Sequence, residues 1–164
     1  MIEEVKIVRR GFMKFISVAI CFSFIFLLTG CGNKTALTSE DFKSKMEGNS
    51  FVVQDATSQM ASYDYITQVY LAIDDSYKYQ IEFYELSDAD YASSFYNNNK
   101  SIFEESKSSS AVETSVSSGN NSKYTLVTNG KYKVVSRIDN TVIYVNADED
   151  YKTEIKDLLK ELGY

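Results

Sequence analysis

The residue best suited to covalent chemistry in this 164-residue chain is Cys31. The chain contains two cysteines and no histidine, and a thiol is the softest nucleophile available to a protein. Cys31 ends the segment Leu28-Thr29-Gly30-Cys31, where small residues follow an apolar run and polar residues follow at once. Small residues next to a scissile bond suit the active site of a signal peptidase. The segment therefore predicts processing of the chain at this thiol.

The apolar run before Cys31 has the length of an export signal. Residues 15–28 read FISVAICFSFIFLL, fourteen residues without a charge, whereas a spanning helix needs roughly 20. Lys6, Arg9, Arg10 and Lys14 precede the run and form the cationic flank that stays on the cytoplasmic side. Residues 1–30 are therefore predicted to be a signal peptide that is removed.

Together these residues resemble the lipobox signal of bacterial membrane lipoproteins. In that family signal peptidase II recognises the positions that Leu28, Thr29 and Gly30 occupy here. The resemblance implies that the Cys31 thiol takes up a diacylglyceryl group and that cleavage leaves Cys31 as a lipidated N-terminus, with palmitate among its acyl chains. Two acyl chains suffice for stable anchoring, since each buried methylene contributes about 0.8 kcal/mol. The expected location is the bacterial cell membrane, facing the extracytoplasmic side.

Three alternatives for this region stay open. Cys31 could instead be a buried cysteine that ends a transmembrane anchor. Translation could begin at Met13 rather than Met1, which would give a more compact signal peptide. The paired Arg9 and Arg10 resemble a twin-arginine export signal, although ordinary Sec export fits the strongly apolar run better.

The composition of the mature chain excludes several function classes. The leader holds four of 17 cationic and two of 23 acidic residues, so residues 31–164 carry 13 and 21, a net charge of −8. Such a surface suits neither nucleic acid nor anionic lipid headgroups. Without histidine or a free thiol, the mature domain lacks His-based and Cys-based catalysis and the usual zinc ligands. We expect no catalytic residues, no cofactor and no enzymatic activity.

Hydrophobic periodicity predicts one domain behind a short tether. Residues 31–37 are the lipidated cysteine and tether, and 38–164 form a single α+β domain. The pattern favours an antiparallel sheet of about six or seven strands built from meanders, with three helices mainly on one face. Helices are expected over 38–48, 88–106 and 148–163, and strands over 51–56, 65–73, 77–86, 123–128, 131–138 and 141–146. Thr38 and Ser87 are the predicted N-caps of the first two helices. The predicted apolar stripes are Ala92, Phe95, Tyr96, Ile102 and Phe103 in the second helix, and Tyr151, Ile155, Leu158, Leu159 and Leu162 in the third.

A serine-rich segment at 106–122 fits either of two structures. Its composition is typical of a flexible linker, whereas Val112, Thr114 and Val116 alternate as in a strand. We favour a strand at 111–117, paired with the next strand as a hairpin. Turns at Asn129-Gly130 and Asp139-Asn140 should then link the remaining strands, because these residues tolerate the positive φ of type I′ turns.

Thirteen tyrosines and no tryptophan are the most unusual feature of the composition, and they allow two interpretations. Strand parity places Tyr70, Tyr84 and Tyr144 on the face opposite the predicted core, where exposed rings could stack on sugars, peptides or a partner protein. The competing interpretation is that tyrosine simply suits a half-wet strand. By the same parity Tyr79, Tyr124 and Tyr132 should point into the core.

Acidic clusters at Asp74-Asp75 and 148–150 lack the ligand spacing of a calcium loop, so no metal site is expected. The sequence favours a lipid-anchored extracytoplasmic binding or interaction domain for an unnamed envelope protein or small ligand. The first alternative is a structural or assembly subunit of an envelope complex. The second is a small hydrolase that would use a pair of carboxylates.

Overall fold

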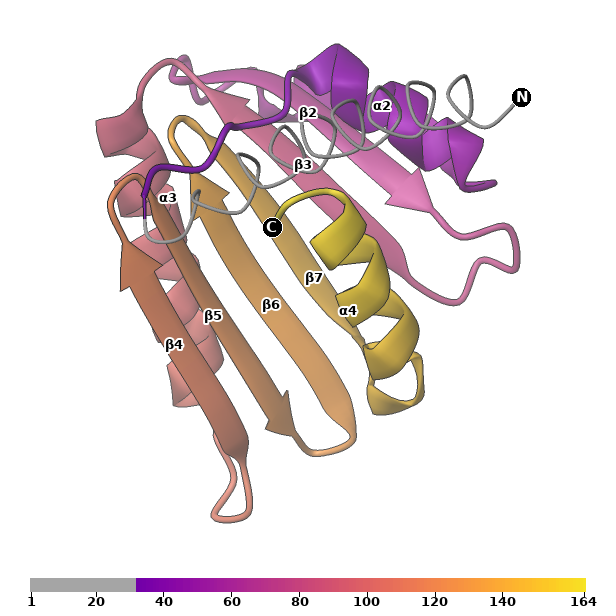
Figure 1. Ribbon diagram of the computed structural model, residues 1–164, viewed down its shortest axis with the longest axis vertical. Coiled ribbons are helices and arrows are strands. Elements are labelled where there is room, and N and C mark those ends of the chain that lie inside the picture. Colours follow the sequence, from indigo (N-terminus) through magenta and orange to yellow (C-terminus); the bar gives the residue numbers. More distant parts are fainter. Residues whose placement is uncertain (1–31) are drawn as a thin grey trace, which may run out of the picture. The chain divides into compact units, whose positions relative to one another are not determined.

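The computed structural model describes residues 32–164 (Figure 1). The predicted signal peptide, the lipobox residues Leu28, Thr29 and Gly30, and the lipidation site Cys31 lie outside the described residues. Within residues 32–164 no helix is both long enough and apolar enough to cross a membrane.

The domain has the predicted α+β order of elements. A helix precedes three strands, a second helix precedes four strands, and a third helix ends the chain. The elements are α2 (Ser39–Gly48), β1 (Val52–Asp55), the 3-10 helix η2 (Thr57–Met60), β2 (Ile66–Ile73), β3 (Gln80–Leu86), α3 (Ala89–Glu105), β4 (Val112–Ser118), β5 (Asn121–Thr128), β6 (Lys131–Ile138), β7 (Thr141–Asp148), the 3-10 helix η3 (Glu149–Tyr151) and α4 (Lys152–Glu161).

All seven strands form one antiparallel sheet in the order β1-β2-β3-β7-β6-β5-β4. Each half is a meander of consecutive strands, as predicted. The halves join where β3 pairs with β7, with Phe83 opposite Ile143. Helix α3 carries the chain from the centre of the sheet to its far edge, so β4 becomes an edge strand.

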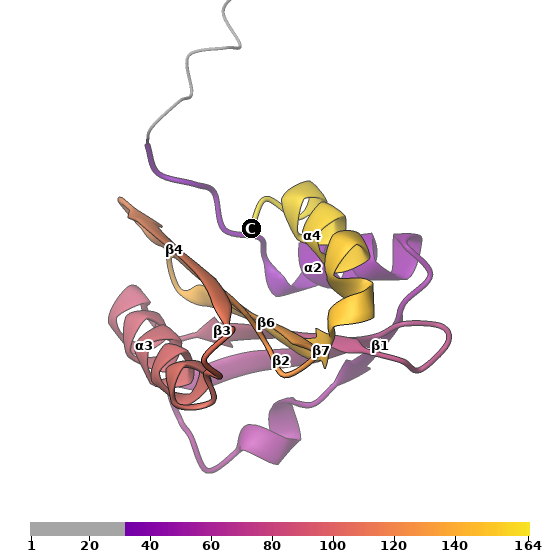
Figure 2. The same ribbon diagram turned by 90° about the horizontal axis from the view of Figure 1, so that it is seen from below.

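Helices cover both faces of this sheet (Figure 2). Two of the three, α2 and α4, share one face, and α3 packs on the other. The central strands allow this because they are apolar on both sides: Phe83 is buried under α2 and α4, and the adjacent Tyr84 is buried under α3. The domain therefore has two hydrophobic cores separated by the sheet.

Helix α2 begins where the sequence predicts. The Thr38 hydroxyl accepts a hydrogen bond from the Asp41 backbone N–H at 3.1 Å, which satisfies one of the free donors of the first turn. Phe42 and Met46 are fully buried, and the Phe42 ring stacks on Phe83 with centroids 4.6 Å apart. This stacked pair joins α2 to the centre of the sheet.

Helices α3 and α4 follow their predicted apolar stripes with two differences. Asp88, rather than Ser87, is the N-cap of α3, and its carboxylate accepts from the backbone N–H groups of Asp90 and Tyr91. Ile102, expected in the stripe of α3, is 51% exposed, while Phe103 beside it is buried. The buried residues of α4 are Ile155, Leu158 and Leu159, as predicted.

The serine-rich segment contains a strand, which confirms the interpretation that the sequence favoured. Strand β4 pairs with β5 along its whole length, from Val112 opposite Val127 to Ser118 opposite Asn121. Gly119, with φ of 54°, supplies the tight turn between the two strands. Only β5 borders β4 in the described sheet, so the other edge of β4 lacks a strand partner there.

The two predicted hairpin turns differ from each other. Asn129 and Gly130 both have positive φ, 51° and 70°, and Thr128 faces Lys131 across the turn as expected for type I′. In the second turn Asp139 has a φ of 49° but Asn140 does not have a positive φ. The Asn140 backbone carbonyl accepts from the Leu86 N–H and its side chain donates back to the Leu86 carbonyl, which ties this residue to β3.

A Gly130→Val substitution should lower the free energy of unfolding by about 1–3 kcal/mol, because it places a β-branched residue at positive φ. The matched control is Gly48→Ala, at a glycine without positive φ where an added Cβ meets no atom within 4 Å. We expect the control to change stability by less than about 1 kcal/mol. Denaturant unfolding of the two variants measures both effects, and equal stabilities would contradict the turn assignment.

Candidate functional site

The tyrosines predicted to form a binding face do not lie together. Tyr70 belongs to the core under α2, whereas Tyr84 and Tyr144 lie on the α3 face of the sheet. Tyr70 and Tyr84 are buried, and Tyr144 is half-buried beside the Phe103 ring. Strand parity failed for Tyr70 because β2 is apolar on both faces, so alternation does not tell which face is outside.

The predicted inward direction was correct for the other three tyrosines, although they enter different cores. Tyr79 and Tyr132 are buried under α2 and α4, and Tyr124 is buried under α3. The Tyr79 hydroxyl donates to Glu154 of α4 at 2.8 Å. These tyrosines connect helices to the sheet and leave little ring surface for a ligand.

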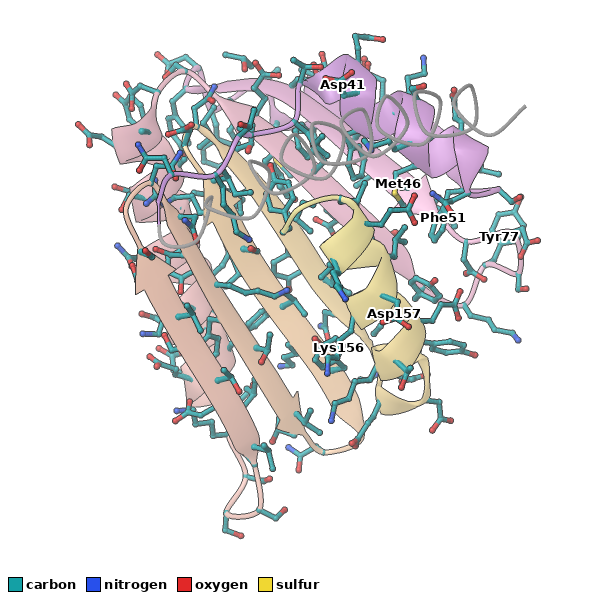
Figure 3. All side chains as sticks on the ribbon, viewed as in Figure 1. Asp41, Met46, Phe51, Tyr77, Lys156 and Asp157 are labelled. Atoms are coloured by element: carbon teal, nitrogen blue, oxygen red, sulfur yellow. The ribbon has the colours of Figure 1, made fainter. Side chains whose placement is uncertain are left out.

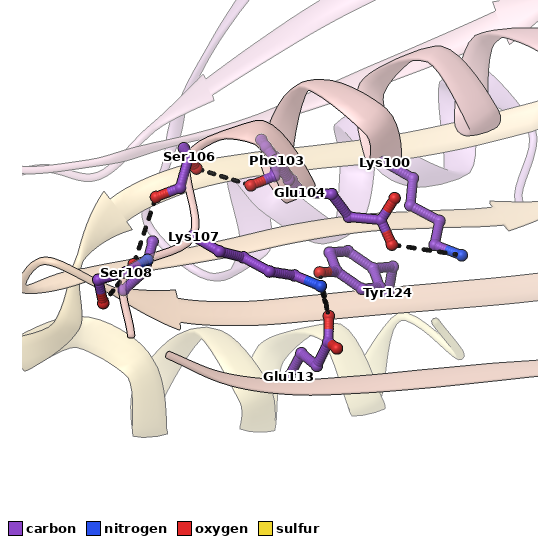
Figure 4. Close-up of polar contacts among 9 residues, drawn as sticks. Lys100, Phe103, Glu104, Ser106, Lys107, Ser108, Glu113 and Tyr124 are labelled. Atoms are coloured by element: carbon purple, nitrogen blue, oxygen red, sulfur yellow. Dashed lines mark hydrogen bonds and ion pairs between the residues drawn. The ribbon is translucent and has the colours of Figure 1, made fainter. Parts of the chain in front are cut away.

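A polar cluster surrounds Tyr124 between α3 and β4 (Figure 4). Lys100 and Lys107 lie over its ring with Nζ 5.5 and 5.9 Å from the centroid, and its hydroxyl donates to Glu113 at 2.6 Å. Lys107 also forms an ion pair with Glu113, and Lys100 pairs with Glu104. Burial and the Glu113 carboxylate raise the pKa of Tyr124. Because each charge has a partner, the cluster fastens α3 and β4 to the sheet.

The acidic clusters have structural partners. Asp74 accepts hydrogen bonds from the backbone N–H groups of Ser76, Lys78 and Tyr79, which close the β2–β3 turn. Burial alone would raise the pKa of Asp74, but these donors hold it below its ordinary value. Asp148 pairs with Lys131 at 2.5 Å.

Asp74 is the only buried carboxylate within residues 32–164. That part of the chain also holds no group of three or more acidic, His or Cys side chains arranged for a metal ion. Two buried carboxylates facing each other, which would favour the hydrolase alternative, are therefore not formed by the described residues. The hydrolase alternative gains no support from this arrangement.

An aromatic surface lies where the loop before β2 meets the first turns of α3. We define it by Tyr63, Tyr65, Tyr91 and Phe95. Tyr65 stacks on Tyr91 with centroids 4.9 Å apart and planes 5° from parallel, and Tyr63 lies 5.8 Å from Tyr65. Tyr63 and Tyr91 are 48% and 47% exposed. Rings that stack on each other and remain half exposed give a surface whose geometry is set before any ligand arrives.

A pocket of about 330 Å³ opens on this aromatic surface, lined by Tyr65, Tyr91, Ser94, Phe95 and Asn98. No lining residue is charged, and Ser94 and Asn98 offer hydroxyl and amide groups beside the rings. Flat rings with a few polar groups are typical of small-ligand sites. Sequence reasoning missed this site, although Tyr91, Phe95, Asn98 and Ile102 form a second stripe along α3 with helical spacing.

A second hollow lies on the other face of the sheet, between α4 and the strands β4, β5 and β6. This lysine groove has a volume of about 690 Å³. Its floor comes from β4, β5 and β6 and its wall from α4. Its lining residues are Val112, Thr114, Val116, Lys123, Thr125, Val127, Tyr132, Lys152, Lys156, Asp157, Lys160 and Tyr164. Four lysines and one acidic side chain thus line a groove in a domain that is acidic as a whole.

The lysines at one end of this groove form no ion pair with an Asp or Glu side chain within residues 32–164. Lys123 donates to the Tyr164 backbone oxygen at 3.2 Å, and Lys34 of the tether donates to the Gly163 carbonyl at 2.8 Å. Burial lowers the pKa of Lys123, and the nearby charges of Lys34 and Lys156 lower it further. Figure 3 shows Lys156 on the side of α4 that faces the strands of the groove floor.

Comparisons with known proteins give no relative for this chain. No protein-family model matches it, and no curated protein or solved structure gives a significant match.

Proposed function

We propose that this protein is a lipid-anchored binding domain on the extracytoplasmic side of a bacterial membrane. The leader pattern that ends in Leu28-Thr29-Gly30-Cys31 supports the anchor, because an apolar run of this length precedes a cysteine in lipobox context. The aromatic surface supports the binding role. The ligand would be a neutral molecule with a flat face that packs against the stack of Tyr65 and Tyr91 in the pocket on this surface.

One observation carries the binding proposal: Tyr65 and Tyr91 are stacked almost parallel at the surface, and Tyr91 keeps 47% of its area exposed. Burying an aromatic ring stabilises a folded protein, and the exposed part of these rings does not contribute that free energy. A ligand that covers these rings recovers that stabilisation without ordering them first, because packing already fixes them. Buried tyrosines such as Tyr79 offer nothing comparable.

The proposal can be tested in living cells with a photoreactive phenylalanine analogue in place of Tyr91. Irradiation should yield a discrete covalent adduct on the anchored protein. The matched control carries the analogue at Tyr77, which is 74% exposed on the distant β2–β3 turn and should give no such adduct. Adding Tyr65→Ala should lower the adduct yield two- to tenfold, since an aromatic pair contributes about 0.5–1.5 kcal/mol. Absence of an adduct at both positions, or equal adducts, would contradict the proposal.

The alternative of an assembly subunit is favoured by a different feature, the outer edge of β4. Val112 and Val116 are 64% and 56% exposed on this strand, and its outer edge lacks a strand partner in the described sheet. An uncovered edge strand is a template for pairing with another chain. The same photoreactive residue at Val116 tests this role, because an edge that pairs with a partner protein should give a protein adduct there.

A further inference from the structure

Three lysines from separate parts of the chain converge at one end of the lysine groove. Lys34 belongs to the tether, Lys123 to β5 and Lys156 to α4. The Lys34 and Lys123 ammonium groups donate to the adjacent main-chain oxygens of Gly163 and Tyr164, and Lys123 and Lys156 line the same groove. The three salt bridges within residues 32–164 involve Lys100, Lys107 and Lys131, so none of the converging lysines is paired with an Asp or Glu side chain there. Gathering like charges costs folding free energy. We call Lys34, Lys123 and Lys156 the lysine cluster.

The tether holds this cluster close to the predicted lipid. The Lys34 backbone N–H donates to the Asn120 side-chain oxygen at 2.9 Å, and the Asn120 amide donates back to the Lys34 carbonyl at 2.8 Å. Figure 1 shows the start of the tether beside the turn that joins β4 and β5. A chain spans at most about 3.6 Å per residue, so the Cα atoms of Cys31 and Lys34 are within about 11 Å of each other. A lipid on Cys31 would therefore bring Lys34 close to the membrane surface, where charges attract over a Debye length of about 8 Å at physiological salt.

From this placement we infer that the lysine cluster binds anionic lipid headgroups and thereby orients the domain on the membrane. The inference rests on the proposed anchor at Cys31. A net charge of −8 repels an anionic surface, but the lysine cluster brings its positive charges to the part of the domain nearest the lipid. Each lysine near such a surface attracts it by about 1 kcal/mol. The groove face of the sheet would then point toward the bilayer.

This orientation has a consequence for the proposed binding site. The lysine cluster lies on the face of the sheet that carries α2 and α4, and α3 with its aromatic surface lies on the opposite face (Figure 2). A domain that docks through the lysines therefore presents Tyr65 and Tyr91 away from the lipid. The membrane and the ligand would contact opposite faces of one sheet.

The test measures how fast each lysine reacts with a membrane-impermeant amine reagent, by mass spectrometry of the lipidated protein in liposomes. In phosphatidylcholine containing phosphatidylglycerol, the cluster should react about fivefold more slowly than in phosphatidylcholine alone, the factor equivalent to about 1 kcal/mol per lysine. Lys78 and Lys131, exposed on distant turns, are internal controls and should react equally in both. In 1 M salt, where the Debye length is about 3 Å, the protection should disappear.

A double variant tests whether the protection of Lys34 comes from the charge of the lysine cluster or only from its position near the membrane. Lys123→Gln combined with Lys156→Gln should restore the reaction rate of Lys34 in anionic liposomes to its neutral-lipid value, and Lys131→Gln should leave the protection intact. Equal rates in the two lipids would overturn the inference and point to an acidic protein segment as the ligand of the groove. Equal protection in neutral lipid would also overturn it. Failure of the anchor itself is seen separately, because an unlipidated protein lacks the lipid mass on its N-terminal peptide.

Discussion

A Cys31→Ser variant should incorporate no labelled fatty acid and should keep its leader. The lipid transfer needs a strong nucleophile, and a thiol with a pKa near 8.5 ionises far more readily than a serine hydroxyl. Because cleavage by signal peptidase II follows lipidation in the family that the leader resembles, the variant should also run at the mass of the unprocessed chain. Feeding cells a labelled fatty acid and purifying the protein measures both effects.

The matched control for this variant is Cys21→Ser. Cys21 lies within the apolar run, upstream of Leu28-Thr29-Gly30-Cys31, and serine already occurs at two positions of that run. The control should be labelled and processed like the wild-type protein. Label retained on Cys31→Ser, or lost equally from both variants, would contradict the lipoprotein interpretation.

The second large effect concerns the core beneath α3. Phe103→Ala should lower the free energy of unfolding by about 3–5 kcal/mol, the range for truncating a fully buried phenylalanine. The Phe103 ring is 1% exposed, lies 5.2 Å from the Tyr144 ring and has the Lys133 Nζ 5.4 Å from its centroid. Denaturant unfolding of the variant measures the loss.

Ile102→Ala is the control for this change at the adjacent position. Ile102 is 51% exposed on the outer side of α3, and surface substitutions usually change stability by no more than about 0.5 kcal/mol. If both faces of the sheet carry a core, the two neighbours should differ by several kcal/mol. A loss below about 1 kcal/mol for Phe103→Ala would mean that α3 contributes little to the fold.

The sequence predicts the elements of this fold well because their signals are local. The cap at Thr38, the turn at Asn129-Gly130 and the stripe of α4 each depend on residues a few positions apart. Even β4 was visible as weak alternation of Val112, Thr114 and Val116. The order of elements and the meanders follow from these local signals.

Which face of the sheet each helix covers was harder to predict. In β2 and β3, Tyr70 and Phe83 face α2 and α4, whereas Tyr84 faces α3. A strand that is apolar on both faces gives no signal of which face lies inside. The expected tyrosine face failed for that reason. A helix on each side of the sheet accounts for the burial of both sets.

The candidate sites could not be predicted from the sequence because each is formed by residues that lie far apart along the chain. Tyr65 and Tyr91 are separated by β2 and β3, and their stacking depends on where α3 begins. Lys34, Lys123 and Lys156 come from three separate segments, and their proximity depends on the tether binding to Asn120. The net charge of the domain predicted that it would not bind anionic lipid headgroups, because a net charge does not show where lysines are clustered.

The most direct test of the anchored-domain account is the mass of the N-terminal peptide of the protein isolated from membranes. The account predicts a peptide that begins at Cys31 and carries the mass of a diacylglyceryl group on that residue. The same spectrum should contain no peptide from residues 1–30. A peptide that begins at Met1 or Met13, or one that begins at Cys31 without added lipid, would contradict the account.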